Sequence, residues 1–147
     1  MGDSEIDYVM RLVLIGDANV GKSCIIGMKM GQTSFKVDDT TPTLKTDSTE
    51  SVNEYYSILP KKKIKLIIHD TPGQESKESF NQNTANHYKE ADGIVICYDI
   101  TNKESFQNVN NWLQKINQYN SECTVIIVGN KFDLEKDRKV SKKEGLV

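Results

Sequence analysis

The sequence lacks the features that mark membrane-spanning, secreted and nucleic-acid-binding proteins. No apolar run approaches the roughly 20 residues that a transmembrane helix needs, and the N-terminus lacks the charged-then-apolar layout of a signal peptide. A formal net charge of -2 over 147 residues gives no basic footprint, which argues against a nucleic-acid partner. Cysteine is scarce, and Cys24, Cys97 and Cys123 form no CxxC or metal-binding pattern. These absences favour one cytoplasmic domain with buried thiols.

What the sequence does contain is a set of short apolar runs. Residues 8–15, 93–98 and 124–128 are rich in β-branched side chains and nearly continuous. Such runs are typical of strands in a parallel sheet that is covered on both faces. Residues 63–69 alternate before they become apolar, so we expect a strand nearer the sheet edge. Residues 52–59 are its expected hairpin partner.

Helical patterns lie between the expected strands. Residues 22–30 follow a glycine-containing loop, and the polar segment 78–90 is a further expected helix. Residues 103–119 have apolar side chains at the three-to-four spacing of an amphipathic helix. These side chains are Phe106, Val109, Trp112 or Leu113, and Ile116. Thr101 is the expected N-cap of this helix, with Glu104 completing a capping box. Alternating strands and helices predict a doubly wound α/β domain.

The segment between the first strand and the first helix matches the phosphate-binding pattern G-x-x-x-x-G-K-[ST]. Its residues are Gly16, Asp17, Ala18, Asn19, Val20, Gly21, Lys22 and Ser23, followed by Cys24. The glycines let the backbone curl so that successive amides face one anion, and the helix start adds partial positive charge. We expect these residues and Cys24 to bind phosphates, with Lys22 neutralising the β- and γ-phosphates. The Ser23 hydroxyl is the expected ligand of Mg²⁺, which prefers oxygen.

A second motif, N-K-x-D, follows the run at residues 124–128 and is formed by Asn130, Lys131 and Asp133. Open α/β sheets bind ligands at the carboxyl ends of their strands, where this motif is expected to lie. A carboxylate there can accept from both the N1–H and the 2-amino group of guanine, a donor pair that adenine lacks. Asp133 therefore predicts guanine as the base, and a P-loop ATPase or kinase is the weaker interpretation.

Together with D-T-P-G-Q-E at residues 70–75, these motifs resemble the Rab branch of the Ras superfamily. The resemblance extends from residue 8 to residue 147 and includes residues 93–113 and 126–134. It implies an α/β fold of the P-loop NTPase class, a Ras-like G domain over residues 1–147. The family's sheet is mostly parallel with one antiparallel edge strand.

The resemblance also implies a function. Small GTPases of the Rab type bind GTP or GDP with Mg²⁺, hydrolyse GTP slowly and regulate vesicle and membrane traffic. An exchange factor, an activating protein and effectors are the expected partners. The expected location is cytoplasmic, with peripheral association on endomembranes.

The family implies further residue roles in the site. Asp70 is expected to contact Mg²⁺ through water, the Gly73 amide to sense the γ-phosphate, and Gln74 to orient the attacking water. Because no arginine has a clear position as an internal finger, we expect slow hydrolysis that an activating protein raises. Asn130, Lys131 and Asp133 are expected to hold the base.

Two residues of the first switch have alternative interpretations. Phe35 resembles the aromatic side chain that caps guanine, and otherwise is an apolar anchor of its loop. Thr43 is the expected switch ligand of Mg²⁺, and Thr41 is the alternative, because the residue before Pro42 is also extended.

The sequence departs from the Rab pattern in its second switch. Pro72 replaces the usual alanine, His69 stands where the family often has tryptophan, and residues 76–79 lack large apolar side chains. Because these changes affect the surface where Rab proteins meet effectors, an alternative function remains open. It is a GTP/GDP-binding module that hydrolyses poorly and has a structural or docking role.

The sequence also stops before the last strand, the Ser-Ala-Lys loop and the final helix of a Ras-like domain. We therefore expect a G domain that is incomplete at its C-terminus, with an unpaired sheet edge at residues 124–128. A second G domain of a tandem GTPase, or a dimer partner, would cover that edge. Membrane association would depend on C-terminal residues that the sequence does not contain.

Overall fold

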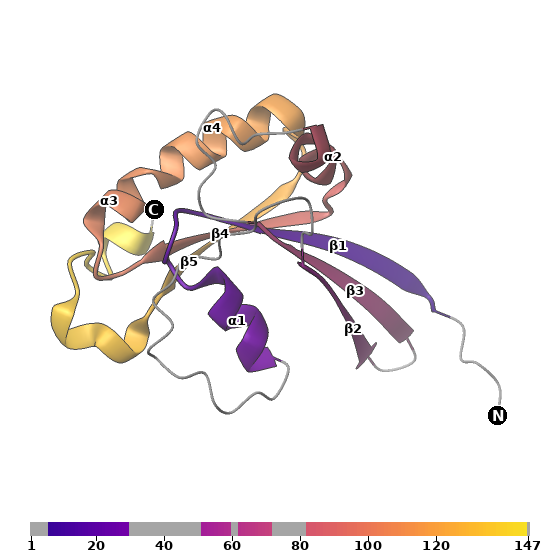
Figure 1. Ribbon diagram of the computed structural model, residues 1–147, viewed down its shortest axis with the longest axis horizontal. Helices are drawn as coiled ribbons and strands as arrows, with labels where there is room; N and C mark the ends of the chain where they lie inside the picture. The colour runs from indigo at the N-terminus through magenta and orange to yellow at the C-terminus, as the bar shows by residue number, and fades with distance from the viewer. Residues whose placement is uncertain (1–5, 30–50, 60–61, 72–81, 147) are drawn as a thin grey trace.

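The computed structural model describes residues 6–29, 51–59, 62–71 and 82–146 (Figure 1). Within these ranges, five strands form one sheet in the order β2-β3-β1-β4-β5. The strands are β1 (Tyr8–Ile15), β2 (Ser51–Leu59), β3 (Lys62–Asp70), β4 (Gly93–Asp99) and β5 (Thr124–Asn130). The neighbouring pairs β1–β3, β1–β4 and β4–β5 are parallel, whereas β2 runs antiparallel to β3. The predicted fold class, a mostly parallel sheet with one antiparallel edge strand, is confirmed.

Helices cover both faces of this sheet. They are α1 (Lys22–Lys29), α2 (Gln82–Glu90), α3 (Lys103–Gln107) and α4 (Val109–Tyr119), with short 3-10 turns η1 (Phe132–Asp137) and η2 (Glu144–Leu146). Figure 1 places α2, α3 and α4 on one face and α1 on the opposite face. None of the helices in the described ranges has the length and apolar character that a bilayer crossing requires.

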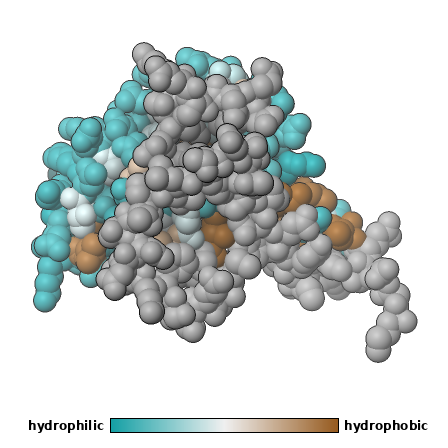
Figure 2. All heavy atoms as spheres, viewed as in Figure 1, coloured by the Kyte–Doolittle hydropathy of each residue, from teal (hydrophilic) through white to brown (hydrophobic). Residues whose placement is uncertain are grey.

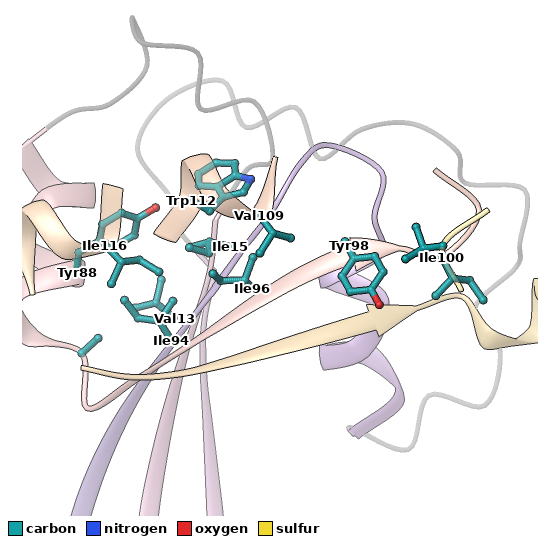
Figure 3. Close-up of a cluster of buried hydrophobic side chains, with 12 residues drawn as sticks. Val13, Ile15, Tyr88, Ile94, Ile96, Tyr98, Ile100, Val109, Trp112 and Ile116 are labelled. Carbon is teal, nitrogen blue, oxygen red and sulfur yellow. The ribbon is translucent and has the colours of Figure 1, made fainter. Parts of the chain in front are cut away.

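The larger hydrophobic core lies between the sheet and the α2–α4 layer (Figure 3). Val13 and Ile15 of β1 pack there with Trp112 and Ile116 of α4. Leu14, between those two β1 residues, enters a smaller cluster on the α1 face. Because successive side chains of a strand point to opposite faces, burial on both faces explains why residues 12–15 are all apolar. Each such side chain contributes about 1.5–3 kcal/mol by its burial.

The expectation that the apolar strands are covered on both faces is wrong for two segments. Tyr8, Val9 and Met10, in the first half of β1, are 55%, 44% and 41% exposed. Figure 2 shows hydrophobic atoms over this outer part of β1. In β5, Ile126 and Ile127 are 56% and 40% exposed. The predicted free edge is confirmed in the described part of the sheet, because β5 pairs there with β4 alone.

The helix predicted over residues 103–119 is divided at Asn108 into α3 and α4. Its N-cap is Asn102 rather than Thr101, because the Asn102 side chain accepts hydrogen bonds from two backbone N–H groups of the first turn. The Thr101 backbone N–H and hydroxyl instead donate to Asp99 Oδ1, at 2.8 and 2.7 Å. The competing acceptor at the end of β4 therefore overturns the predicted cap.

The cysteines are free thiols, as predicted, but only one of them is buried. Burial raises the pKa of the Cys97 thiol to about 11. Cys24 and Cys123 are half-buried, so the expectation of three buried thiols is wrong for these two. Cys97 lies in β4, whose faces are both covered, whereas the other two lie at the start of α1 and just before β5.

Candidate functional site

The loop at residues 16–23 joins β1 to α1, so the strand–loop–helix context that the motif requires is present. Its backbone is left-handed at three positions, Gly16 (φ 138°), Asn19 (φ 62°) and Gly21 (φ 93°). A Cβ at Gly16 would clash with the Cys97 carbonyl oxygen, and one at Gly21 would clash with the side chain of Asn130. Glycine is therefore required at both positions by conformation and by space.

Lys22 is held over the loop by the loop's own backbone. The side chain is buried, and its Nζ donates to the carbonyl oxygens of Gly16 at 2.9 Å and Asp17 at 2.7 Å. These contacts hold an ammonium group against the backbone at the start of the loop. The arrangement places positive charge where the sequence predicts the β- and γ-phosphates.

Ser23 and Asp70 form a hydroxyl–carboxylate pair beside this loop. Ser23 Oγ donates to Asp70 Oδ2 at 2.6 Å, and Asp70 ends β3 at 5% exposure. The other oxygen, Asp70 Oδ1, is buried and has no hydrogen-bond partner among the described residues. A buried carboxylate oxygen without a donor is costly. A water bound to a hard cation would supply the missing donor, and two oxygen-bearing side chains fit the ligand preference of Mg²⁺.

The N-K-x-D motif lies against the loop. Asn130 is the last residue of β5, and its Nδ2 donates to the carbonyl oxygens of Val20 at 2.9 Å and Gly21 at 3.3 Å. These bonds fasten residues that are about 110 positions apart in the chain. Asp133, in η1, has an exposed side chain. The structure therefore brings the two motifs together, with Asn130 as the link between them.

Lys131 is positioned by an acid that sequence reasoning missed. Its backbone is left-handed (φ 67°), and its Nζ lies 2.8 Å from Asp99 Oδ2. Burial opposes the ionisation of Asp99, but hydrogen bonds from Lys131 and Thr101 outweigh that effect and lower the pKa of Asp99. The available signal was an aspartate at the carboxyl end of an apolar run, the same position that Asn130 has in its own run.

A second missed contact reaches the loop from the helical layer. Both oxygens of the Asp17 carboxylate accept hydrogen bonds from Asn108 and Trp112. The sequence placed Asp17 among the phosphate-binding residues and Trp112 in the core, and gave no sign that the two side chains meet.

Some predicted site residues lie outside the described residues: Phe35, Thr41, Thr43, Gly73 and Gln74. Their roles stay predictions, as does the effect of Pro72. His69 lies within β3, where its ring stacks on His87 of α2 with centroids 4.2 Å apart. Burial first, then His87 and Arg11, lower the pKa of His69, while Glu90 raises it.

Comparison with known proteins shows which family the chain resembles. The family model described as the Ras family matches residues 11–146. Ras-related protein RABC1 of Arabidopsis thaliana is 40% identical, over 99% of this chain and 65% of that protein. GTP-binding protein ypt2 of Schizosaccharomyces pombe is 39% identical, over 99% of this chain and 68% of that protein. Ras-related protein SEC4 of Candida albicans is 39% identical, over 95% and 62%. The chain thus spans 62–68% of the length of these relatives.

Proposed function

This chain belongs to the Ras family as a Rab-type small GTPase, and from that premise we propose that it binds GTP and GDP with Mg²⁺ and hydrolyses GTP slowly. The observation that carries the proposal is the link from Asn130 to the carbonyls of Val20 and Gly21. One side of that link is a loop suited to phosphates, and the other is a motif suited to guanine. A ligand that contains both groups fits the two sites together.

The phosphate side supplies positive charge and amide donors. Lys22 and the N-terminus of α1 offset the negative charge of the phosphates, and the curled backbone between Gly16 and Gly21 provides N–H groups. Ser23 would hold Mg²⁺ directly and Asp70 would hold it through water. When bound, the ion neutralises charge on the phosphates.

The base side supplies selectivity. Asp133 is exposed and able to accept the two donors of guanine, whereas adenine would leave the carboxylate facing an unsuitable edge. Lys131, held by Asp99, and Asn130, held by the loop, fix the first two residues of the motif, before Phe132 and Asp133. The motif therefore presents its acceptor from two anchored neighbours.

Hydrolysis on this proposal is mostly positioning and charge stabilisation. Gln74 would orient the attacking water, the Gly73 amide would sense the γ-phosphate, and Thr43 would join Mg²⁺ in the GTP state. Phe35 would cap the base. An activating protein would raise the slow rate by adding positive charge.

In the cell, the proposed role is a switch that regulates vesicle and membrane traffic, cytoplasmic and peripheral on endomembranes. Its support is the resemblance to the Rab branch, with relatives named Ras-related protein SEC4 and GTP-binding protein ypt2. An exchange factor, an activating protein and effectors would control this switch. Residues 1–147 would form one G domain.

The proposal is tested by the nucleotide that co-purifies with the full chain and by calorimetry with GDP, ADP and xanthosine diphosphate. We expect bound guanine nucleotide, and Mg²⁺-dependent affinity for GDP over ADP. Asp133→Asn should move preference toward xanthosine diphosphate. Asp137→Asn, an exposed acid in the same turn η1, is the matched control. Protein that purifies empty and takes up no GDP would overturn the proposal.

Hydrolysis needs its own measurement. Phosphate release from bound GTP should be slow, and Gln74→Leu should slow it further. The alternative, a docking module that binds but barely hydrolyses, predicts equal rates for Gln74→Leu and the unmodified chain.

A further inference from the structure

The Asp17 carboxylate in the phosphate loop is held by two side chains of the helical layer. Asn108 Nδ2 donates to Asp17 Oδ2 at 2.7 Å, and Trp112 Nε1 donates to Asp17 Oδ1 at 2.9 Å. The donors lie 91 and 95 positions from Asp17 in the chain. Each carboxylate oxygen therefore has its own neutral donor, and both bonds are partly buried. We call these three residues the loop clamp.

A carboxylate in this loop has a physical cost that the loop clamp offsets. Phosphates are anions, and a nearby acid repels them with an energy that grows as water is excluded. Hydrogen bonds to both oxygens hold the carboxylate toward the helical layer. The backbone carbonyl of the same residue accepts from Lys22 Nζ at 2.7 Å. Asp17 thus connects the helical layer to the cation that the phosphates need.

The helical side of the loop clamp is rigid. Trp112 is 8% exposed and packs in the larger core with Val109 and Ile116 (Figure 3). Asn108 stands at the junction of α3 and α4, where its side chain makes no cap hydrogen bond. Its Nδ2 is used for Asp17, and its Oδ1 accepts from Asn111 Nδ2 at 3.3 Å. The junction side chain therefore connects the loop, through its Nδ2, to α4, through its Oδ1.

We propose that Trp112 and Asn108 are positioning residues that hold the phosphate loop in its binding conformation through Asp17 and thereby slow nucleotide release. The inference rests on the proposed nucleotide binding. Loss of either donor leaves one carboxylate oxygen without its partner, and the loop is then free to move the acid toward the phosphates. The Gly16 and Asp17 carbonyls that hold Lys22 move with it.

The test is the rate at which the full chain releases a fluorescent GDP derivative into excess GDP with Mg²⁺. Trp112→Phe keeps an aromatic ring in the core and removes the N–H donor together with part of the indole ring, so the double-mutant cycle below separates the lost hydrogen bond from the lost packing. We expect about tenfold faster release, the effect of losing one hydrogen bond to a charged group. Asn108→Ala, at a half-buried position, should act in the same direction and serves if Trp112→Phe does not fold.

A double-mutant cycle separates positioning from general loosening. Asp17→Ala removes the acceptor, so adding Trp112→Phe to it should change the release rate by less than about twofold. Ile116→Val is the matched control, because it removes one methylene from the same core without touching the loop. Its release rate should equal that of the unmodified chain. Trp112 is also the only tryptophan, so Asp17→Ala should shift its fluorescence emission.

The outcomes distinguish the two claims. If the unmodified chain binds no GDP, the proposed function fails. If the unmodified chain binds GDP and Trp112→Phe releases it at the same rate, the loop clamp is wrong. It is also wrong if Ile116→Val accelerates release equally, or if the Asp17 and Trp112 effects are additive. Faster release that vanishes in the Asp17→Ala background supports it.

Discussion

The phosphate loop at residues 16–23 and the base motif at residues 130–133 lie side by side, but they are supported differently. The loop follows the fully buried Ile15, and its Val20 and Lys22 are 1% and 6% exposed. The base motif follows a strand at the sheet edge, and its Phe132 is 64% exposed. The loop is therefore fixed by the core, whereas the motif is fixed by a few polar bonds to its neighbours.

This difference indicates how the phosphates and the base of a bound nucleotide would each gain affinity. A core-supported loop is already formed before the phosphates arrive, so little ordering is needed on binding. A motif held by individual hydrogen bonds depends on each of them. Substitutions in the loop should therefore affect folding and binding together, and substitutions around the motif should affect binding more selectively.

The largest effect is expected at Gly16. Gly16→Ala adds a Cβ against the Cys97 carbonyl oxygen at a left-handed backbone position. We expect a loss of about 2–4 kcal/mol in unfolding free energy, together with loss of GDP binding. Urea unfolding and calorimetry measure the two. Gly93→Ala is the control, because its Cβ would come too close only to the end of the Leu12 side chain, while the Thr124 carbonyl oxygen stays at an ordinary contact distance of 3.7 Å. Equal losses of unfolding free energy and GDP affinity in Gly16→Ala and Gly93→Ala would show that the loop is no more sensitive than the rest of the sheet.

The next largest effect is expected at Asn130. Asn130→Ala removes both bonds to the loop carbonyls and should destabilise the protein by about 1–3 kcal/mol. GDP affinity should fall by about tenfold or more, since each 1.4 kcal/mol is tenfold. Asn120→Ala is the matched control, because Asn120 Nδ2 likewise donates to two carbonyls, those of Tyr88 and Ala91. If the two variants have similar unfolding free energies but only Asn130→Ala loses GDP affinity, the base motif depends on its polar bonds as described. Equal GDP affinities in the two variants would contradict that.

Sequence reasoning reached the parts of the site whose chemistry is local. The loop pattern follows from neighbouring residues, and an apolar run predicts a strand whether or not it is covered. For the same reason, the apolar pattern did not predict that Ile15 is buried while Val9 is exposed, or that β4 is covered while β5 is largely exposed. The pairs Asp17–Trp112 and Asn130–Val20 join residues 95 and 110 positions apart, so no local pattern contains them. The N-cap error has the same origin, because a local rule could not weigh the Asp99 acceptor.

A smaller effect is expected from pH, through Asp99. Its pKa is lower in the folded protein than the ordinary value of 3.8. The stabilisation is therefore present above that value and is lost as pH falls through the lower, folded value. Unfolding free energy should decline on acidification, and Asp99→Asn should flatten part of that decline. Urea unfolding from about pH 5 to about pH 2 measures it. Asp137→Asn, which removes an exposed acid, is the control. If the unfolding free energy declines equally in Asp99→Asn and in the unmodified chain, the contact between Asp99 and Lys131 contributes nothing to stability.

The smallest effect on the site is expected at the edge that supports the base motif. Ile126, in the middle of β5, is 56% exposed, and an apolar edge strand is open to pairing with another chain. Ile126→Lys should change unfolding free energy by no more than about 0.5 kcal/mol, because the side chain is on the surface. It should lower concentration-dependent association in sedimentation without changing GDP affinity. Thr124→Lys adds the same charge at an exposed polar position of β5 and should change association less. A loss of GDP affinity in Ile126→Lys would mean that the edge and the base motif are coupled, and that the motif is not held by its polar bonds alone.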